Sequence, residues 1–143
     1  MSHRYLVDTN LLIYPLDARD PAKQRRAAEV LRELARRGDA ALPAQALAEF
    51  SSVVLRRLQP PLSPDQAFRE VERLMTAFPV LPLSAAVVLE ALRGVARHRL
   101  SYYDAQVWAT ARLHQIPLVL SEDFPAGATL EGVQFLNPLE AEF

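Results

Sequence analysis

The stretch "RYLVDTNLLIY", residues 4–14, places an aspartate inside an otherwise apolar run. The residues up to Asp8 have the short, apolar character of a buried strand. The residues after it, 9–14, favour a turn or two of helix, which Pro15 should end because its ring clashes with the preceding turn. Aspartate is among the best helix N-caps, so capping alone accounts for Asp8 unless other residues give it a second role.

Beyond this stretch, short apolar segments alternate with longer amphipathic ones. Strands that are separated by helices favour parallel βαβ units. We therefore expect an α/β fold with three layers, α/β/α, around a small and mainly parallel sheet of four to five strands. The prolines in 78–83 suit a strand at the edge of that sheet. The expected strands are 4–8, 40–43, 78–83, 117–121 and 133–136, and the expected helices are 9–14, 21–38, 44–58, 63–78, 84–99 and 102–115.

Two of the expected helices, 44–58 and 63–78, carry apolar residues at helical spacing. Such spacing gathers the apolar side chains into one stripe along each helix. The stripe of the first helix is Leu47, Phe50, Val54 and Leu58, and that of the second is Phe68, Val71, Leu74, Met75 and Phe78.

The composition fits one soluble globular domain that spans residues 1–143. Half of the residues are hydrophobic, 23% are charged, and the net charge is −1. Because the chain has no cysteine, disulfides, cysteine-ligated zinc and thiol nucleophiles are excluded. The sequence shows no signal peptide and no apolar run as long as a membrane span, so we expect a cytoplasmic protein with no membrane partner.

The basic residues are arginines, apart from Lys23, and they gather in local clusters. A net charge of −1 argues weakly against tight non-specific binding of nucleic acid. The guanidinium fork suits phosphate groups, but a solvated helix face is the simpler explanation of any one cluster. The clusters are 23–26, 31–37, 54–58 and 93–99.

A few of the 17 acidic residues do not look like ordinary surface charge. Asp8 and Asp123 lie at or just after expected strands. Asp104 stands three residues after Ser101, as in a capping box, and Asp123 could hold a turn. Glu49 is the hardest to explain structurally, because it lies at the margin of a buried stripe, where an unpaired carboxylate is costly.

The topology would bring three of these acids together. In open parallel sheets, functional residues gather outside the carboxyl ends of the strands. If strands 4–8 and 117–121 are neighbours, Asp8, Asp104 and Asp123 converge on that edge of the sheet. Carboxylates so close raise one another's proton affinity unless a cation neutralises them. Oxygen ligands without cysteine or histidine point to Mg²⁺ or Mn²⁺.

Several other chemistries lack their motifs. The four glycines form neither GxGxxG nor a P-loop, so dinucleotide and NTP sites are not expected. GxSxG is absent, and the three histidines form no HExxH pair. An aspartyl-phosphate phosphatase of the haloacid dehalogenase type would need a second aspartate two positions after Asp8, where this chain has Asn10.

Four stretches of the chain together resemble the PIN-domain nucleases, and among them the VapC-like toxins of bacterial toxin–antitoxin pairs. Each motif is weak alone, but the order, the spacing and the total length agree with the family, so the resemblance covers essentially the whole chain. The stretches are "LVDTNLLIY" (6–14), "QALAEF" (45–50), "LSYYDAQVWATAR" (100–112) and "LVLSEDFPAG" (118–127), and "FLNP" (135–138) resembles the family's ending.

The resemblance places the family's acidic residues on Asp8, Glu49, Asp104 and Asp123, which we call the acidic quartet. It implies that Asp8 and Asp104 are the central ligands of Mg²⁺ or Mn²⁺ and that Asp123 completes the cluster. Glu49 would hold a second metal or orient water as a base. The small polar residues that would steady these carboxylates are Thr9, Asn10 and Ser121.

The resemblance also implies the activity, which is metal-dependent hydrolysis of RNA phosphodiester bonds, together with an antitoxin protein and a second copy of the chain as partners. Of the adjacent acids Glu122 and Asp123, the family's pattern favours Asp123. Tyr103 stands where many relatives have tryptophan. Glu90 matches no motif of the family. An arginine from 93–99 would position the substrate phosphates.

Two further functions remain as alternatives. The chain could be a catalytically silent binding module of the same fold that acts through a protein partner, with an apolar helix such as 63–78 as its contact. It could also be a phosphatase-like phosphotransferase with a phosphoenzyme at Asp8, against which Asn10 argues. The intact acidic quartet favours the nuclease, because a scaffold does not need four carboxylates at one edge.

Overall fold

The computed structural model describes residues 3–125 and 127–143. Met1 and Ser2, at the start of the expected domain, and Ala126, inside the motif 118–127, lie outside the described residues. The elements in chain order are β1 (Tyr5–Val7), α1 (Thr9–Ile13), the 3₁₀ helix η1 (Tyr14–Leu16), α2 (Pro21–Arg37), β2 (Ala40–Pro43), α3 (Ala44–Arg56), α4 (Pro64–Ala77), β3 (Val80–Leu81), α5 (Ala85–His98), α6 (Tyr102–Leu113), β4 (Leu118–Leu120), β5 (Thr129–Leu130) and β6 (Val133–Leu136).

The strands form one sheet in the order β3-β2-β1-β4-β6-β5. Every neighbouring pair is parallel except β5 and β6. β1 and β4 are direct neighbours, with Tyr5 opposite Leu118 and Val7 opposite Leu120. The predicted α/β class and mainly parallel sheet are confirmed, and so is the pairing that brings the ends of these two strands together.

The expected number of four to five strands is wrong by one. The additional strand, β5, has two residues and runs antiparallel to β6. Glu131 and Gly132 connect the two strands, and both have positive φ, 49° and 86°, as a tight two-residue hairpin requires. A strand of two residues shows no alternation that could be read in the sequence.

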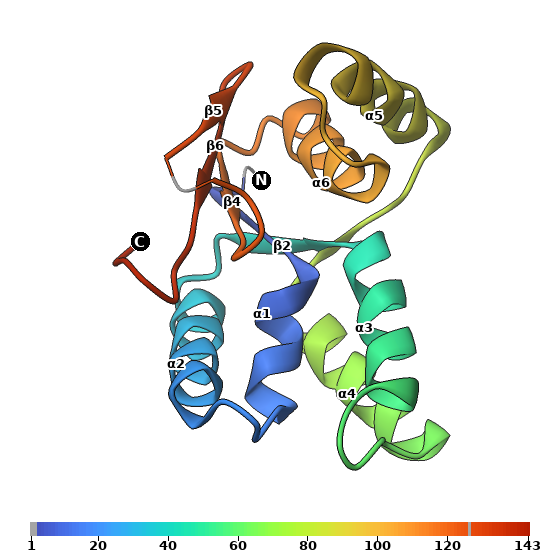
Figure 1. Cartoon of the computed structure of the whole chain (residues 1–143), viewed down its shortest axis with the longest axis vertical. Coiled ribbons are helices and arrows are strands. Elements are labelled where there is room, and N and C mark those ends of the chain that lie inside the picture. Colours follow the sequence, from blue (N-terminus) through green and yellow to red (C-terminus); the bar gives the residue numbers. More distant parts are fainter. Residues whose placement is uncertain (1–2, 126) are drawn as a thin grey trace.

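Helices cover both faces of the sheet (Figure 1). Side chains alternate along β1, so that Tyr5 and Val7 pack in the core cluster with α1, α2, α3 and α4. Leu6 packs on the opposite side with α5 and α6. The expected three layers are confirmed. In the part of the chain that the structure describes, no helix is both long and apolar enough to span a membrane.

The first helix ends differently from the expectation. α1 ends at Ile13, and Pro15 lies near the start of the 3₁₀ helix η1 and continues the helical path. A proline is tolerated there, because the first N–H groups of a helix have no partner within the helix. The other helices and the five expected strands have boundaries within two residues of those predicted.

The two apolar stripes have different surroundings. The stripe of α3, from Leu47 to Leu58, is buried. On α4, Phe78 just past the helix is buried, but Phe68 and Met75 are 66% and 57% exposed. α4 packs mainly on α3, so its neighbours cover only part of its stripe.

Close packing of α5 on α6 fixes where the first turn of α6 lies. Gly94 on α5 faces the indole of Trp108, and a Cβ built at Gly94 would lie 2.7 Å from two ring atoms. Trp108 is fully buried, and its indole N–H donates to the Leu130 carbonyl at 3.1 Å. The glycine therefore allows α6, which carries Asp104, to lie tightly between α5 and the sheet.

Candidate active site

The acidic quartet comes from separate elements that meet at the carboxyl ends of the central strands. Asp8 directly follows β1, and Asp123 lies three residues after β4. Glu49 lies on α3, and Asp104 lies in the first turn of α6. The fold thus places the four predicted residues at one edge of the sheet.

Asp8 is a buried carboxylate that caps α1 and also binds the neighbouring strand. Its Oδ1 accepts from the Thr9 N–H at 2.8 Å, and its Oδ2 accepts from the Ser121 hydroxyl at 2.7 Å. Its exposed fraction is 5%. Burial, with smaller contributions from the charges of Asp123 and Asp104, raises the pKa of Asp8 to about 6, although its two hydrogen bonds lower it. The cap predicted from sequence is present. Each carboxylate oxygen already accepts one hydrogen bond, and a carboxylate oxygen can accept a second contact, so capping does not exclude a second role.

Ser121 connects the ends of β1 and β4. Besides donating to Asp8, its hydroxyl oxygen accepts from the Asp123 N–H at 3.1 Å and from the Asn10 amide at 3.4 Å. The same Asn10 amide donates to Asp123 Oδ2 at 3.0 Å. Two of the small polar residues identified in the sequence therefore hold two of the four carboxylates in place.

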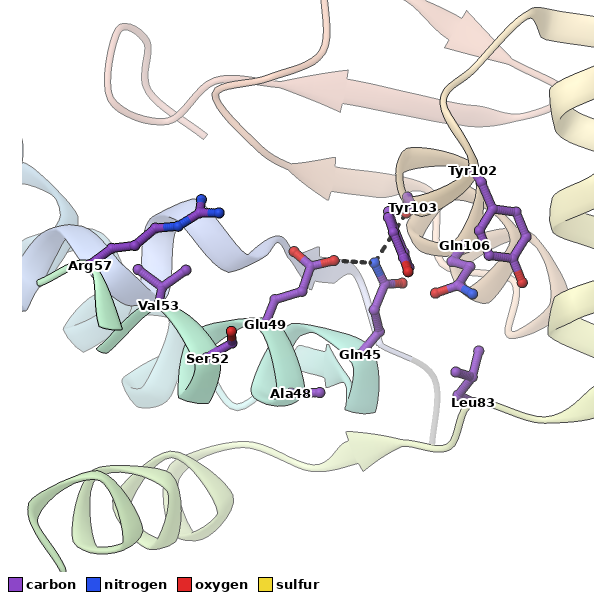
Figure 2. A pocket seen from close by; sticks show the side chains of 10 residues that line it. All are labelled: Gln45, Ala48, Glu49, Ser52, Val53, Arg57, Leu83, Tyr102, Tyr103 and Gln106. Carbon is purple, nitrogen blue, oxygen red and sulfur yellow. Dashed lines mark hydrogen bonds between the residues drawn. The ribbon is translucent and has the colours of Figure 1, made fainter. Parts of the chain in front are cut away.

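Glu49 is held by hydrogen bonds from both sides. The Thr9 hydroxyl donates to its Oε2 at 3.1 Å, and the Gln45 amide donates to its Oε1 at 2.7 Å. Gln45 also donates to the Tyr103 carbonyl at 3.2 Å, which ties α3 to the first turn of α6 (Figure 2). The sequence analysis did not identify Gln45, although its spacing of four residues before Glu49 on a helix was a readable signal.

Asp104 shows only half of the capping box that its sequence resembles. Its N–H donates to the Ser101 hydroxyl at 3.3 Å, and within residues 3–125 and 127–143 no reciprocal bond from the Ser101 N–H to its carboxylate is found. Burial, and then the charges of Asp123 and Glu49, raise the pKa of Asp104. A side-chain hydrogen bond with Ser101 lowers the pKa of Asp104, so its carboxylate contacts the start of the helix and also lies near two other acids.

The two adjacent acids after β4 point to different partners. Glu122 accepts from the Tyr14 hydroxyl and pairs with Lys23 Nζ at 2.6 Å. Asp123 is bound to Asn10 instead. Of the two acids, Glu122 is thus the one neutralised by a cation. Neither Tyr14 nor Lys23 carried a sequence signal for this contact, because the pairing depends on the approach of α2 to the β4 loop.

The structure shows which arginines near the site are paired with acids and which one lines the same pocket as Glu49. Arg93, in the segment expected to position phosphates, pairs with Glu90 and with Glu131 at 2.9 Å. Glu90, which was left out of the site, also pairs with Arg112 at 3.4 Å. Arg57 on α3 lines the same pocket as Glu49 (Figure 2).

The carboxylate oxygens of the acidic quartet are the kind of ligand that a hard divalent cation prefers. The four side chains do not, however, surround a common point. Among the described residues, no lysine, arginine or histidine forms an ion pair with any of the four. Within the same residues, no three acidic or histidine side chains stand so that they could hold a metal ion. Mg²⁺ is commonly held by one or two carboxylates and several waters, so this spacing remains compatible with it.

Comparisons with solved structures show the same fold in several proteins. A toxin–antitoxin complex from Klebsiella pneumoniae matches with a TM-score of 0.65 and 19% identity, over 94% of this chain and 97% of that chain. VapC20 from Mycobacterium tuberculosis, described as a sarcin–ricin loop cleaving toxin, matches with a TM-score of 0.66 and 23% identity, over 89% and 97%. VapBC2 from Rickettsia felis, bound to a promoter DNA fragment, matches with a TM-score of 0.64 and 12% identity, over 92% and 96%.

The search of curated protein sequences finds no match. The model of the PIN domain matches residues 5–124, which include the whole acidic quartet and its supporting residues. The chain belongs to the PIN domain family.

Proposed function

We propose that this protein is a metal-dependent endoribonuclease that hydrolyses RNA phosphodiester bonds. The observation that carries the proposal is the acidic quartet, whose carboxylates meet at one sheet edge without an ion-pair partner among the described residues. Uncompensated carboxylates destabilise the free protein, so a bound cation is the physical reason to keep them. Membership of the PIN domain family and the fold shared with a sarcin–ricin loop cleaving toxin support the choice of substrate.

In this proposal, Asp8, Asp104 and Asp123 would hold Mg²⁺ or Mn²⁺, some of them through bound water, because no three acidic side chains surround one point among the described residues. Glu49 would hold a second ion or orient the attacking water. A bound divalent cation supplies a more acidic water and stabilises charge that builds on the phosphate. Glu49 has half-buried surroundings and fixed hydrogen bonds on both oxygens, which suits a group that orients one water.

The supporting residues would act by keeping the carboxylates aimed at one point. Ser121 binds Asp8 and the backbone of Asp123, and Asn10 binds the Asp123 side chain. Thr9 fixes Glu49 across the α1–α3 contact. Groups of this kind restrict ligand orientation before the ion arrives, and their loss costs metal affinity.

We further propose that the enzyme is the toxin of a toxin–antitoxin pair, that it works in the cytoplasm, and that it binds both an antitoxin protein and a second copy of itself. The shared fold with chains from toxin–antitoxin complexes supports the protein partner. Large exposed side chains on α4 and α5 are available for such contacts, namely Phe68, Met75, Leu89 and Leu92. A partner that covers them would remove apolar surface from water.

The test measures cleavage of a structured RNA with Mg²⁺ or Mn²⁺, with a chelator, and with the variant Asp8→Asn. We expect activity only with metal and intact Asp8. Glu90→Gln is the control, because Glu90 is a half-buried acid outside the acidic quartet that is paired with arginines. Cleavage that persists in the chelator or in Asp8→Asn would contradict the proposal.

Calorimetric titration with Mn²⁺ separates the nuclease from a catalytically silent binding module. The nuclease requires binding that Asp8→Asn weakens and Glu90→Gln does not. A chain that binds no Mn²⁺ at millimolar concentration, yet retains a protein partner, would be the module.

A further inference from the structure

A pocket opens beside Glu49, between α3, the first turn of α6 and the segment that leads into α5 (Figure 2). Its cavity volume is about 780 Å³, which is large enough for a nucleobase and its sugar. We call it the α3–α6 pocket. Glu49 is part of its wall, so a ligand in the pocket would lie directly next to the acidic quartet.

One end of the pocket is aromatic. Tyr102 and Tyr103 come from the first turn of α6, with ring centroids 5.5 Å apart and planes inclined by 59°. Tyr103 is 63% exposed, although it lies next to the proposed reaction centre. An exposed aromatic ring offers a flat face on which any base can stack.

Near the tyrosines, the pocket is also lined by the side-chain amides of Gln45 and Gln106, whose oxygens lack a hydrogen-bond partner among the described residues. Gln106 is only 4% exposed, and its amide oxygen is buried without a hydrogen-bond partner among the described residues. The amide oxygen of Gln45 is in the same condition, although its NH₂ group binds Glu49 and the Tyr103 carbonyl. A buried acceptor without a partner costs stability, and a ligand that donates a hydrogen bond would remove that cost.

The other end of the pocket is cationic. Arg57 lies eight residues after Glu49, which corresponds to about 12 Å along the axis of α3. Figure 2 shows Glu49 between Arg57 on one side and the tyrosines on the other. The order along the pocket is thus a cation, Glu49 of the acidic quartet, and a stacking platform with amides.

We propose that the α3–α6 pocket is a subsite for one unpaired base of a single-stranded RNA segment, next to the bond that is cut. Tyr103 stacks on the base, Gln106 forms hydrogen bonds with its edge, and Arg57 pairs with a phosphate of the same strand. The inference rests on the proposed nuclease function, since it places the strand across Glu49. An apolar side chain of a protein partner would leave the Gln106 amide unpaired, which favours the base as the occupant.

Binding is tested first, in a chelator so that no cleavage occurs. The probe is a short single-stranded RNA in which 2-aminopurine replaces one base, moved along the strand from one oligonucleotide to the next. We expect fluorescence quenching at one position, and a loss of affinity of roughly 5- to 150-fold in Tyr103→Ala, the range typical of one base–aromatic stack. Tyr103→Phe should retain the quenching, because the ring remains.

Leu113→Ala is the control, because Leu113 is an exposed apolar residue at the other end of α6, outside the pocket lining. It should bind the probe like the unaltered chain. Equal affinity of Tyr103→Ala and Leu113→Ala for every probe would overturn the subsite.

Cleavage with Mg²⁺ provides the second arm, using RNA strands in which a single base is removed at successive positions. One abasic position should raise KM by the same factor as Tyr103→Ala, and the two changes together should add nothing further. If the protein cuts RNA but no abasic position and no Tyr103 variant alters KM, the subsite is wrong and the nuclease stands. If nothing is cut but Tyr103-dependent quenching remains, the nuclease is wrong and the base-binding pocket stands.

Gln106→Met distinguishes recognition of the base edge from a structural role. The substitution conserves volume and removes the unpaired amide, so thermal stability should be unchanged or higher. We expect weaker binding that depends on which base occupies the quenched position. A variant that binds all bases as the unaltered chain does would remove Gln106 from the proposal.

Discussion

Two groups of acidic side chains in this protein are treated in opposite ways. Near β5, Glu131 accepts from Arg93 at 2.9 Å and His98 at 2.6 Å, and hydrogen bonds from Arg93 and then His98 lower the pKa of Glu131 to about 2. Hydrogen bonding to Arg93 likewise lowers the pKa of Glu90. With Arg112, these residues form what we call the arginine cluster.

The acidic quartet lacks such cations among the described residues, and the pKa of Asp8 is raised by burial to about 6. In the arginine cluster, Arg93 and Arg112 neutralise the charges of Glu90 and Glu131. The negative charges of the acidic quartet have no such compensation among the described residues. The acids of the arginine cluster, which have a structural role, form ion pairs with basic residues of the same chain. Acids left without one at a sheet edge indicate that the missing charge comes from outside the chain.

The largest expected difference between the two groups is in catalysis. Asp104→Asn should lower RNA cleavage by about a thousandfold, because a lost ligand removes several kcal/mol of transition-state stabilisation. Glu131→Gln should leave the rate within about twofold, since a surface substitution of this kind does not touch the reacting groups. Single-turnover cleavage at saturating metal measures both. If the cleavage rate fell by a similar factor in both variants, the acidic quartet would have no special role in catalysis.

The next effect is on the free energy of unfolding. The ionised Asp8 side chain destabilises the folded chain, whereas ionised aspartates more often stabilise it. The pKa of Asp8 is about 6 in the folded chain and 3.8 as an ordinary value, so folding loses stability as pH rises from about 4 to 6 and stays weaker above 6. Asp8→Asn keeps an acceptor oxygen for the Thr9 N–H and offers its NH₂ group to the Ser121 oxygen. It should be more stable at pH 7 without metal, by at most about 3 kcal/mol.

Denaturant unfolding of Asp8→Asn and the unaltered chain in a chelator, from pH 4 to 8, measures this gain. Added Mn²⁺ should stabilise the unaltered chain and narrow the difference. An Asn variant that is less stable than the unaltered chain at pH 7 without metal would show that Asp8 serves the fold alone.

A smaller effect is expected from the residues that hold the carboxylates. Ser121→Ala removes a hydrogen bond to Asp8 and one from the Asp123 backbone, and should weaken Mn²⁺ binding by about 10- to 100-fold. Ser51→Ala is the control, because among the described residues the Ser51 hydroxyl binds only the Leu47 carbonyl of its own helix. Calorimetry compares the two, and an unchanged affinity in Ser121→Ala would remove Ser121 from the site.

The smallest effect concerns the arginine cluster. Glu131→Gln should lower stability by about 1 kcal/mol at neutral pH, as expected for partly exposed ion pairs. Because the folded pKa of Glu131 is depressed to about 2, the difference should be full above about pH 4.5 and vanish as pH falls towards 2. Thermal unfolding from pH 2 to 7 measures it, and a gap that persists at pH 2 would contradict the ion-pair origin.

Much of the fold was readable in the sequence, because strands such as 118–120 and helices such as 85–98 have apolar patterns and caps of their own. β5 was missed because two residues carry no pattern, and its hairpin depends on positive φ at Glu131 and Gly132. The partial exposure of the α4 stripe was also unreadable, since periodicity identifies an apolar face but not what covers it.

The residues of the acidic quartet could be identified from motifs, but their neighbours largely could not. The family's pattern favoured Asp123 over Glu122, but that Lys23 and Tyr14 bind Glu122 could not be read in the sequence. The α3–α6 pocket likewise has no sequence signature, because its walls come from α3 and α6, which lie far apart in the chain.

The stretch 4–14 shows both what the sequence determined and what the tertiary structure decided. The sequence by itself determined a strand, a capping Asp8 and a helix, since these depend on local hydrophobicity and on hydrogen bonds between adjacent residues. The tertiary structure alone decided that Ser121 and the charges of Asp104 and Asp123 surround the same carboxylate. The physical reason is that burial and charge proximity arise between elements, whereas capping arises within one.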